Sequence, residues 1–494
     1  MPHAARCCVR GCRQECDTFL RRVAMSTERA SEPSSLCHLS IVETGKLLAA
    51  KKLSPVEVVD AALDRIATVD PKLHSFITVT PEAARHQAKL SEARYMKGAA
   101  IGAFDGIPFA LKDNIETRGI RSTSHSKLLL DNIPQEDAHV AGMLGGAGGI
   151  LLGKTATFEF ALGGPSWDLP FPPALNPWNL RHLPGGSSSG SGAAVAARLV
   201  PAAIGTDTGG SVRWPAAVCG IAGLKPTYGR ISRRGVHPNT FSLDHCGPMT
   251  RTVEDCAVML GAVAGYDPRD PGSINEPVPD YFSALTGSIK GLRIGLVRHW
   301  YSEAATPEVV AAVDAAVATL RGLGGIVEEI TLSPLSDYID SKTTISLCEL
   351  YAIHERDIKT RPQDFGHLLR TRVIAGGLIR AEDYVQAMRW RTELTTKMLA
   401  EFSRYDVLVT AGWLSPAEAA DPTAPDFFKR RQIVTMPFSL SGIPALSVPC
   451  GFSAGGLPLA LQIAGRPFDE ATVLRTGDAY QRVTDWHARI PPLT

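Results

Sequence analysis

The chain has 494 residues and a mass of 52.8 kDa; 44% of its residues are hydrophobic and 20% are charged, which is the composition of a folded globular protein. Lys and Arg number 51 and Asp and Glu number 50, so the formal net charge of +1 argues against a general nucleic-acid binder. No apolar run reaches the ~18 residues of a membrane-spanning helix, and we therefore expect neither a nucleic-acid partner nor a membrane.

The first 25 residues differ in composition from the rest of the chain. They lack the apolar stretch of a secretory signal, but they hold four of the ten cysteines, flanked by arginines: Cys7, Cys8, Cys12 and Cys16. A zinc site would need a further pair of ligands at finger spacing, so we favour a tail outside the fold. We expect residues 1–35 to be an N-terminal tail and residues 36–494 to form one domain. The other six cysteines stand among apolar neighbours, which favours reduced thiols and a cytoplasmic protein.

Predicted helices and short apolar strands alternate along the chain. One helix is predicted to begin after Ser54, an N-cap that is followed by a proline and by Glu57 of a capping box. Later helices are predicted at residues 193–200, 252–264, 306–320, 381–402 and 469–481. Strands are predicted at residues 108–111, 149–152, 202–205, 293–297, 326–330, 407–409, 445–448 and 459–463. Residues 265–291, rich in Pro and Asp, predict a long surface loop. The alternation favours one large α/β domain whose sheet is covered by helices on both faces.

Residues 148–155 match the phosphate-binding pattern G-x-x-x-x-G-K-[ST], which makes an ATPase one candidate. In that motif a strand precedes the first glycine, and the loop after it wraps the phosphates. Here the apolar residues Ile150, Leu151 and Leu152 lie between the two glycines and themselves read as a strand. Because a buried strand cannot also wrap phosphates, we disfavour nucleotide binding.

A Gly- and Ser-rich segment, residues 184–192, runs directly into the predicted helix at 193–200. It contains a G-x-S-x-G match around Ser188, typical of the nucleophile elbow of α/β-hydrolases. The residues before it form a poor strand, and no later Asp and His stand out, although Asp244–His245 and Asp485–His487 are available. A flexible linker would not lead straight into a helix, so we interpret the segment as a functional loop at a helix N-terminus.

A third segment places a serine after two glycines at a strand end. Gly209 and Gly210 allow successive backbone N–H groups to point at one spot, as an oxyanion hole requires. Ser211 would then stand where it can attack a substrate carbonyl carbon. A plain tight turn with Ser211 as a helix cap is the alternative interpretation.

Lys112 follows the apolar strand predicted at residues 108–111. Burial at this strand end would disfavour the charged ammonium and lower the pKa of Lys112, so that the neutral amine could act as a base near pH 7. The alternative is an ordinary lysine that pairs with Asp113 or Glu116.

Taken together, these segments resemble the amidase signature family of serine hydrolases. The resemblance covers roughly residues 38–490. The matching segments are residues 105–114, 153–155, 176–178, 184–188, 205–213, 223–229, 442–449 and 456–458. The family implies a single α/β/α domain around a large, mostly parallel, twisted mixed sheet. It also accounts for the Gly-Lys-Thr of the apparent phosphate-binding pattern, which belongs to the family's own sequence.

The resemblance implies a Ser–Ser–Lys triad. Lys112 would be the general base, Ser187 the bridging serine on a cis peptide bond after Gly186, and Ser211 the nucleophile. A serine hydroxyl needs a base within hydrogen-bond reach, and a lysine can take that role in such triads. The chemistry requires no metal and no cofactor.

The resemblance also implies how the site is completed. The oxyanion hole would be formed at Thr208, Gly209 and Gly210, with the N–H of Ser211. The loops would be held by Ser188, Asp207 and Arg213.

The sequence departs from the family pattern at a few positions. Ser189 stands where many members have glycine, and Gly412–Trp413 stands where members often have a proline-containing turn. Gln432 replaces the Asp that helps the glutaminase subunits of tRNA amidotransferases to bind glutamine, which argues against that role. Residues 158–173, with Trp167 and Phe171, should border the substrate pocket and suggest a hydrophobic or aromatic substrate.

The sequence therefore predicts a cytoplasmic amidase that cleaves the C–N bond of carboxylic amides through an acyl-Ser211 intermediate. Carbamates, as for a urethanase, and esters are related substrates. One alternative is the glutaminase A subunit of a tRNA-dependent amidotransferase, and another is a catalytically inactive scaffold with the amidase fold. We expect a small-molecule substrate and a monomer or homodimer.

Overall fold

The computed structural model describes residues 33–162, 164–422 and 433–493. The cysteines of the predicted N-terminal tail and Gln432 lie outside the described residues. The first described element is the short helix α2 (Pro33–Leu36), so the expected start of the domain at residue 36 falls on its last residue.

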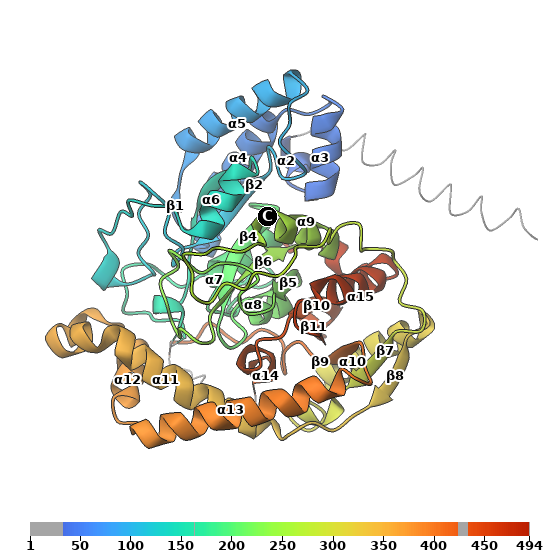
Figure 1. The fold of residues 1–494 in the computed structure, drawn as a ribbon. Helices are drawn as coiled ribbons and strands as arrows, with labels where there is room; N and C mark the ends of the chain where they lie inside the picture. The colour runs from blue at the N-terminus through green and yellow to red at the C-terminus, as the bar shows by residue number, and fades with distance from the viewer. Residues whose placement is uncertain (1–32, 163, 423–432, 494) are drawn as a thin grey trace, which may run out of the picture.

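Within the described residues, eleven strands form one sheet in the order β1-β3-β2-β4-β6-β5-β10-β11-β9-β7-β8 (Figure 1). The strands are β1 (Phe76–Val79), β2 (Pro108–Lys112), β3 (Ile150–Thr155), β4 (Ala202–Asp207), β5 (Ala222–Lys225), β6 (His245–Thr250), β7 (Arg293–Leu296), β8 (Ile326–Glu329), β9 (Val407–Ala411), β10 (Ala445–Phe452) and β11 (Pro458–Gly465). Every predicted strand is confirmed, whereas β1, β5 and β6 were not predicted.

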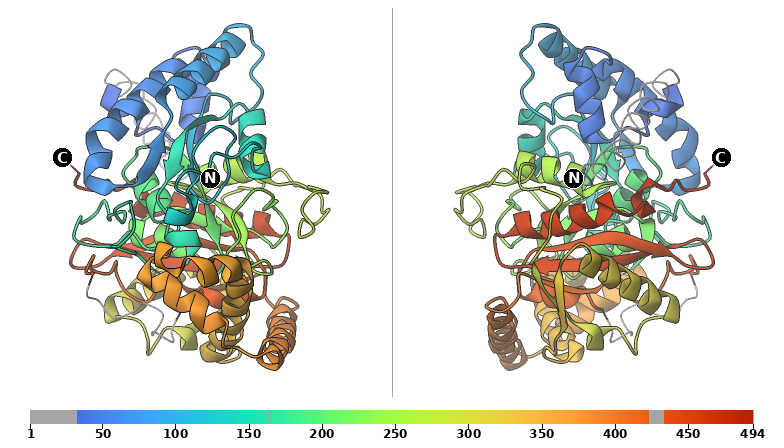
Figure 2. Two further views of the ribbon diagram at one scale, coloured as in Figure 1. Left: turned by 90° about the vertical axis from the view of Figure 1, so that its left-hand side faces the viewer. Right: turned by 90° about the vertical axis from the view of Figure 1, so that its right-hand side faces the viewer.

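The longer helices are α3 (Ile41–Ala49), α4 (Pro55–Leu73), α5 (Pro81–Met96), α6 (His139–Gly146), α7 (Ser189–Ala196), α8 (Arg213–Cys219), α9 (Val253–Val263), α10 (Pro307–Gly322), α11 (Leu335–Thr360), α12 (His367–Gly376), α13 (Ala381–Glu401), α14 (Met436–Leu440) and α15 (Glu470–Arg482). Helices α3 to α5 lie at one end of the molecule and α11 to α13 at the other, as the views in Figure 2 agree. The predicted capping box at Ser54 and Glu57 is present. Residues 265–291 contain neither helix nor strand, as predicted.

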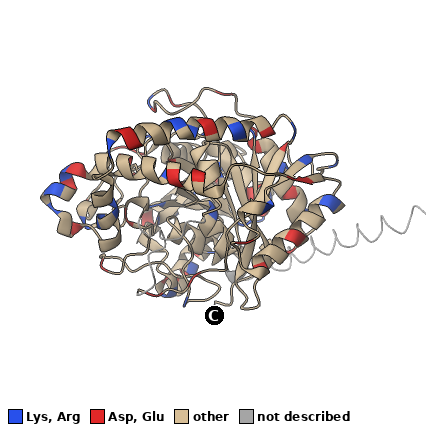
Figure 3. Cartoon of the chain, turned by 90° about the horizontal axis from the view of Figure 1, so that it is seen from below, with Lys and Arg blue, Asp and Glu red and all other residues tan. Residues whose placement is uncertain are grey.

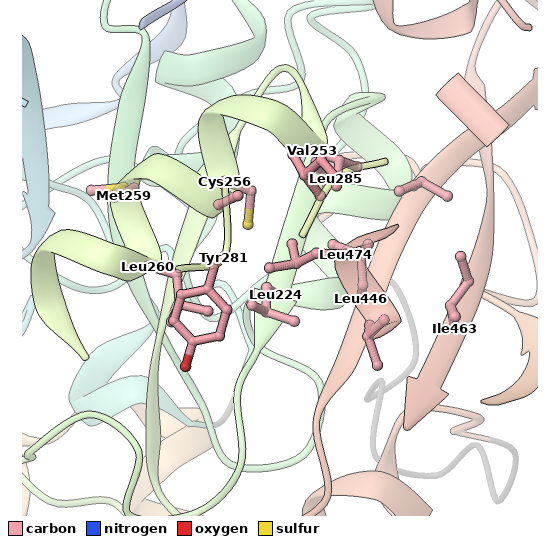
Figure 4. Close-up of a cluster of buried hydrophobic side chains, with 14 of the residues drawn as sticks. Leu224, Val253, Cys256, Met259, Leu260, Tyr281, Leu285, Leu446, Ile463 and Leu474 are labelled. Carbon is pink, nitrogen blue, oxygen red and sulfur yellow. The ribbon is translucent and has the colours of Figure 1, made fainter. Parts of the chain in front are cut away.

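Alternate residues of the central strands face different sides of the sheet. Phe109 and Leu111 of β2 belong to the core cluster that includes helices α9 and α15, part of which Figure 4 shows. Ala110, between them, belongs to a second cluster with helices α4 and α7. This alternation is that of a strand buried on both faces. The predicted single α/β domain, with a mixed sheet covered by helices, is therefore confirmed.

The expected predominance of parallel strand pairs is wrong. Four neighbouring pairs are parallel, two on each side of the middle of the sheet. The edge pair of β1 and β3 is antiparallel. The five successive pairs from β4 to β9, in the middle, are antiparallel. The outer parallel strands are joined by crossover helices, such as α10 between β7 and β8. By contrast, β10 and β11 are joined by a short hairpin connection, which makes an antiparallel pair.

Figure 3 colours the charged residues along the chain and shows both signs. Lys and Arg are interspersed with Asp and Glu along its helices, in keeping with the nearly balanced charge of the whole chain. Among the described residues, no helix is both long enough and apolar enough to cross a bilayer.

Candidate active site

Lys112, the last residue of β2, is fully buried and forms two short hydrogen bonds. Its Nζ lies 2.7 Å from Ser187 Oγ and 2.7 Å from Thr206 Oγ1. Thr206 is available because β4 runs parallel to β2 in the sheet. Burial lowers the pKa of Lys112 to about 7, although Asp207 and Asp244 act in the opposite direction. The side chain can therefore be neutral near neutral pH, as a proton acceptor must be.

Lys112 does not pair with Asp113, which was its alternative role. Asp113 lies 3.7 Å from Lys154 Nζ and accepts hydrogen bonds from Thr123. Lys154 is buried within β3, and its Nζ also bonds Ile115 O and Ser122 Oγ. The phosphate-binding interpretation of residues 148–155 is thus wrong, because Gly153 and Lys154 lie within strand β3 and Gly148 lies just before this strand.

Ser187 lies on the loop that leads into α7. The peptide bond between Gly186 and Ser187 is cis, where the resemblance implies one. A Cβ on Gly186 would overlap the ring of Phe158, so only glycine fits there. The next residue, Ser188, donates its N–H to Ser211 O at 3.2 Å and thereby joins the two serine loops.

The nucleophile-elbow interpretation of Ser188 is wrong. The Ser188 side chain is fully buried. Its Oγ bonds the backbone O and N–H of Thr206, at 3.2 Å each. The hydroxyl therefore ties the loop to β4 and is not presented to a substrate. His245 offers no better base, because it is buried and its Nδ1 faces the backbone oxygens of Asp207 and Leu243.

Ser211 follows β4 and precedes α8. In the described part of the chain its Oγ and its N–H form no hydrogen bond, and the N–H of Gly209 likewise forms none. The N–H of Gly210, by contrast, donates to Asp207 Oδ1 at 2.8 Å. Of the predicted oxyanion-hole positions, Gly209 and Ser211 thus have backbone donors free for a substrate oxygen, and Gly210 does not.

Asp207 and Arg213 form a buried ion pair under this turn. Arg213 Nη2 lies 2.9 Å from Asp207 Oδ1, and both side chains are fully buried. Burial alone would raise the pKa of Asp207, but Arg213 outweighs it and holds this pKa well below its ordinary value. Arg213 also bonds Gln462 Oε1 at 2.7 Å and Thr435 O at 2.8 Å. The turn that carries Ser211 is thereby anchored to the C-terminal part of the chain.

A pocket opens at the two serines. Its polar lining among the described residues comes from Ser187, Thr208, Ser211, Thr435 and Lys342. Its larger apolar lining comes from Phe158, Leu162, Trp214, Trp413, Ile433 and Met436. The rings of Trp214 and Trp413 stack, with centroids 4.7 Å apart. An aromatic or aliphatic substrate group would suit these walls.

Trp167 and Phe171 are not in this pocket, contrary to prediction. Trp167 is 45% exposed, and Phe171 lines a separate hollow beside Phe76. Of this segment, Phe158, Ala161 and Leu162 line the pocket, and none of its described residues after Leu162 does. The predicted segment thus contributes only its first residues, among them Phe158.

The sequence reasoning missed two groups of the site. Thr206 lies within β4, and its hydroxyl accepts a hydrogen bond from Lys112 Nζ. In the sequence, Thr206 looks like an ordinary strand residue. Lys342 reaches the pocket from α11, a helix that was not predicted. A helical pattern was available, since Tyr338, Lys342 and Ile345 recur on one buried face of α11.

No group of three or more His, Cys, Asp or Glu side chains among the described residues is placed to hold a metal ion. The cysteines within the described ranges are free thiols: Cys37, Cys219, Cys246, Cys256, Cys348 and Cys450.

Comparisons with known proteins agree with this geometry. The family model named Amidase matches residues 57–474. The A subunit of the glutamyl-tRNA(Gln) amidotransferase of Roseiflexus sp. (strain RS-1) is 41% identical over 487 residues, covering 93% of this chain and 99% of that protein. The crystal structure of the protein of that name from Thermotoga maritima is 31% identical, with a TM-score of 0.78 over 93% of this chain and 98% of its own. A bacterial aryl acylamidase of the amidase signature family is 27% identical, with a TM-score of 0.84 over 91% of this chain and 97% of its own. The Amidase model matches most of the chain, these relatives match it over nearly its full length, and the fold is shared with solved members. The chain therefore belongs to the amidase signature family.

Proposed function

We propose that this protein hydrolyses a carboxylic amide through a covalent acyl-Ser211 intermediate. The observation that carries the proposal is the buried Lys112, whose Nζ lies 2.7 Å from Ser187 Oγ at the edge of the pocket that Ser211 lines. A lysine with a pKa near 7 in that position is poised to accept a proton.

The reaction follows from these positions. Ser211 Oγ attacks the amide carbon while its proton passes to Ser187, and the proton of Ser187 passes to neutral Lys112. The oxyanion that forms accepts hydrogen bonds from the N–H groups of Gly209 and Ser211. The protons return along the same path to the leaving amine, the C–N bond breaks, and water then releases the acid from Ser211 by the reverse relay. Ser187 and Ser211 must come within hydrogen-bond distance when substrate binds, as happens in many sites that are loose without it.

The proposal is tested by trapping the acyl-enzyme. The purified protein is mixed with aryl amides, primary amides, carbamates and esters, and its mass is measured during turnover. We expect an acyl adduct on Ser211, and its absence together with loss of several powers of ten in rate in Ser211→Ala. An adduct on another serine, or a Ser211→Ala variant that keeps its rate, would overturn the assignment. The inactive-scaffold alternative predicts no turnover of any amide.

A second candidate is the glutaminase activity of an amidotransferase A subunit. It is favoured by the near full-length similarity to proteins named as A subunits of glutamyl-tRNA(Gln) amidotransferase. In that case the protein would release ammonia from glutamine within a larger complex that acts on tRNA, and the expected lack of a nucleic-acid partner would hold only for the first candidate. The two are distinguished by assaying the purified chain alone. A lone amidase turns over simple amides, whereas a component of such a complex needs its partners and prefers glutamine.

The pocket lining supports the first candidate. Glutamine carries an ammonium beside its carboxylate, yet no acidic side chain lines the pocket among the described residues. Its aromatic walls instead suit a hydrophobic amide or carbamate. The free thiols of the described residues support the proposed location in the cytoplasm.

A further inference from the structure

Lys342 is the one charged side chain that lines the pocket among the described residues. It projects from the buried face of α11 and is only 3% exposed. A charged group this deeply buried normally has a partner of opposite charge or several hydrogen bonds.

Lys342 has no such partner in the described part of the chain, where its Nζ forms no hydrogen bond and no ion pair. The two carboxylates that act on it at longer range, Asp207 and Asp244, are occupied. Asp207 binds Arg213. Asp244 accepts from Thr208 Oγ1 at 2.6 Å and from backbone N–H groups. The ammonium therefore retains donors that no described residue satisfies.

The position of Lys342 relates it to the reaction. A Cβ added to Gly209 would lie 3.1 Å from Lys342 Cε and 3.2 Å from Lys342 Nζ. The ammonium thus lies against the residue whose N–H is a proposed oxyanion donor. A substrate group that meets Lys342 would be only a few bonds from the scissile carbonyl.

We propose that Lys342 binds a carboxylate of the substrate, so that the preferred amide carries a carboxylate near its scissile carbonyl and no positive charge beside it. This inference rests on the proposed amide hydrolysis and names its substrate class. The described lining offers no acidic side chain to an ammonium, which favours this class over free amino acids. Burial lowers the pKa of Lys342 to about 8, so the side chain is still mainly charged at pH 7.

Matched substrate pairs test the proposal. The first pair is the mono-4-nitroanilide of succinic acid and 4-methylpentanoyl 4-nitroanilide, in which an isopropyl group replaces the carboxylate. The second pair places the charge on the amine half: N-butanoylglycine and N-isobutylbutanamide. We expect the wild-type protein to prefer the anionic member of at least one pair by about 10-fold or more in kcat/KM, and the pair that responds identifies the half that carries the carboxylate.

Variants assign the preference to Lys342. In Lys342→Met the ratio of kcat/KM values, anionic over neutral, should fall by about 10- to 100-fold, mainly through a higher KM for the anion. Lys342→Arg should keep part of the preference. Lys359→Met is the matched control, because Lys359 lies on the same helix but is exposed and paired with Glu355. It should leave the ratio at the wild-type value.

Two results would overturn the inference: a wild-type protein without anionic preference in either pair, or a Lys342→Met variant that slows both members of a pair equally while its melting temperature falls. The latter would make Lys342 a counter-ion for Asp207 and Asp244. If the wild-type protein hydrolyses none of the four amides, calorimetric binding of the succinic anilide to Ser211→Ala and to Ser211→Ala/Lys342→Met tests the carboxylate site separately from the proposed hydrolysis. Equal affinity of the two variants would then refute the carboxylate site.

Discussion

At the scale of single residues, the burial of Lys112 has the largest chemical consequence. A lysine in water is protonated up to about pH 10.4, whereas burial lowers the pKa of Lys112 to about 7. Below pH 7 the side chain is an ammonium and cannot accept a proton. We therefore expect kcat/KM for 4-methylpentanoyl 4-nitroanilide to rise with pH through about 7 and then to level off. A neutral substrate is used so that binding of a charged group does not add to the profile.

Replacement of Lys112 should remove both the rate and this pH dependence. Lys112→Met should lose about 10²- to 10⁴-fold in kcat/KM, and Lys112→Arg should not restore it because a guanidinium stays charged. Circular dichroism and thermal melting are the controls for folding. A folded Lys112→Met protein with near-normal turnover and an unchanged pH profile would show that the lysine is structural.

The ion pair of Asp207 and Arg213 should be a large stabilising contact. Asp207→Asn leaves Arg213 buried without its counter-charge, and we expect the free energy of unfolding to fall by about 3–5 kcal/mol in urea titrations at pH 7. Because Arg213 lowers the folded-state pKa of Asp207, the loss should be present above about pH 4 and should shrink in more acidic solution. Asp60→Asn, which breaks an exposed pair with Arg85, is the control and should change little. Equal effects of the two variants would contradict the buried pair.

The sequence singles out Ser187, Ser211 and Lys112 as candidates because each stands in a short local motif. Thr206 and Lys342 could not be found in that way, since they reach the site only through strand pairing and through a distant helix. The error at Trp167 and Phe171 has the same origin. The lining of this segment extends only to Leu162, so aromatic residues a few positions later in the sequence lie outside the pocket.

At the scale of elements, α7 and α8 pack closely through a glycine. A Cβ on Gly192 would lie 2.9 Å from Pro215 Cβ. We expect Gly192→Ala to lower the free energy of unfolding by about 1–3 kcal/mol, because these helices would have to move apart. The matched control is Gly142→Ala in α6, where nothing lies within 4 Å of the new Cβ. That variant should be more stable by about 0.5–1 kcal/mol, since alanine favours a helix. Denaturant unfolding of both variants measures the contrast.

The elements that were predicted and those that were missed differ in their local signals. Strands such as β2 and β3 are apolar and buried, and periodicity reveals them. Strand β6 contains a glycine and a proline, which speak against a central strand, yet it is paired on both sides. Helix α11 starts without a side-chain cap and holds consecutive β-branched residues from Thr343 to Ile345, so tertiary packing rather than propensity decides its structure.

At the scale of the whole molecule, the N-terminal tail should be dispensable. The composition of residues 1–25 changes abruptly at their end, and no segment of the resemblance falls there. We expect a protein that lacks residues 1–25 to keep its kcat/KM and its melting temperature nearly unchanged. Metal analysis of both proteins accompanies the comparison. Loss of bound zinc together with a large fall in melting temperature would show instead that Cys7, Cys8, Cys12 and Cys16 form a structural site.

The anchoring of Arg213 has a consequence for the order in which the protein is made. Arg213 bonds Gln462, 249 positions later in the chain, and strand β5 pairs with β10 across a similar separation. During synthesis, Lys112, Ser187 and Ser211 therefore leave the ribosome long before the strands that fix the turn around Ser211 have been made. A nascent or prematurely terminated chain holds all three residues of the proposed triad, but it lacks the C-terminal strands and Gln462 that hold the turn around Ser211. The proposed amide hydrolysis can therefore begin only when synthesis of the chain is almost complete.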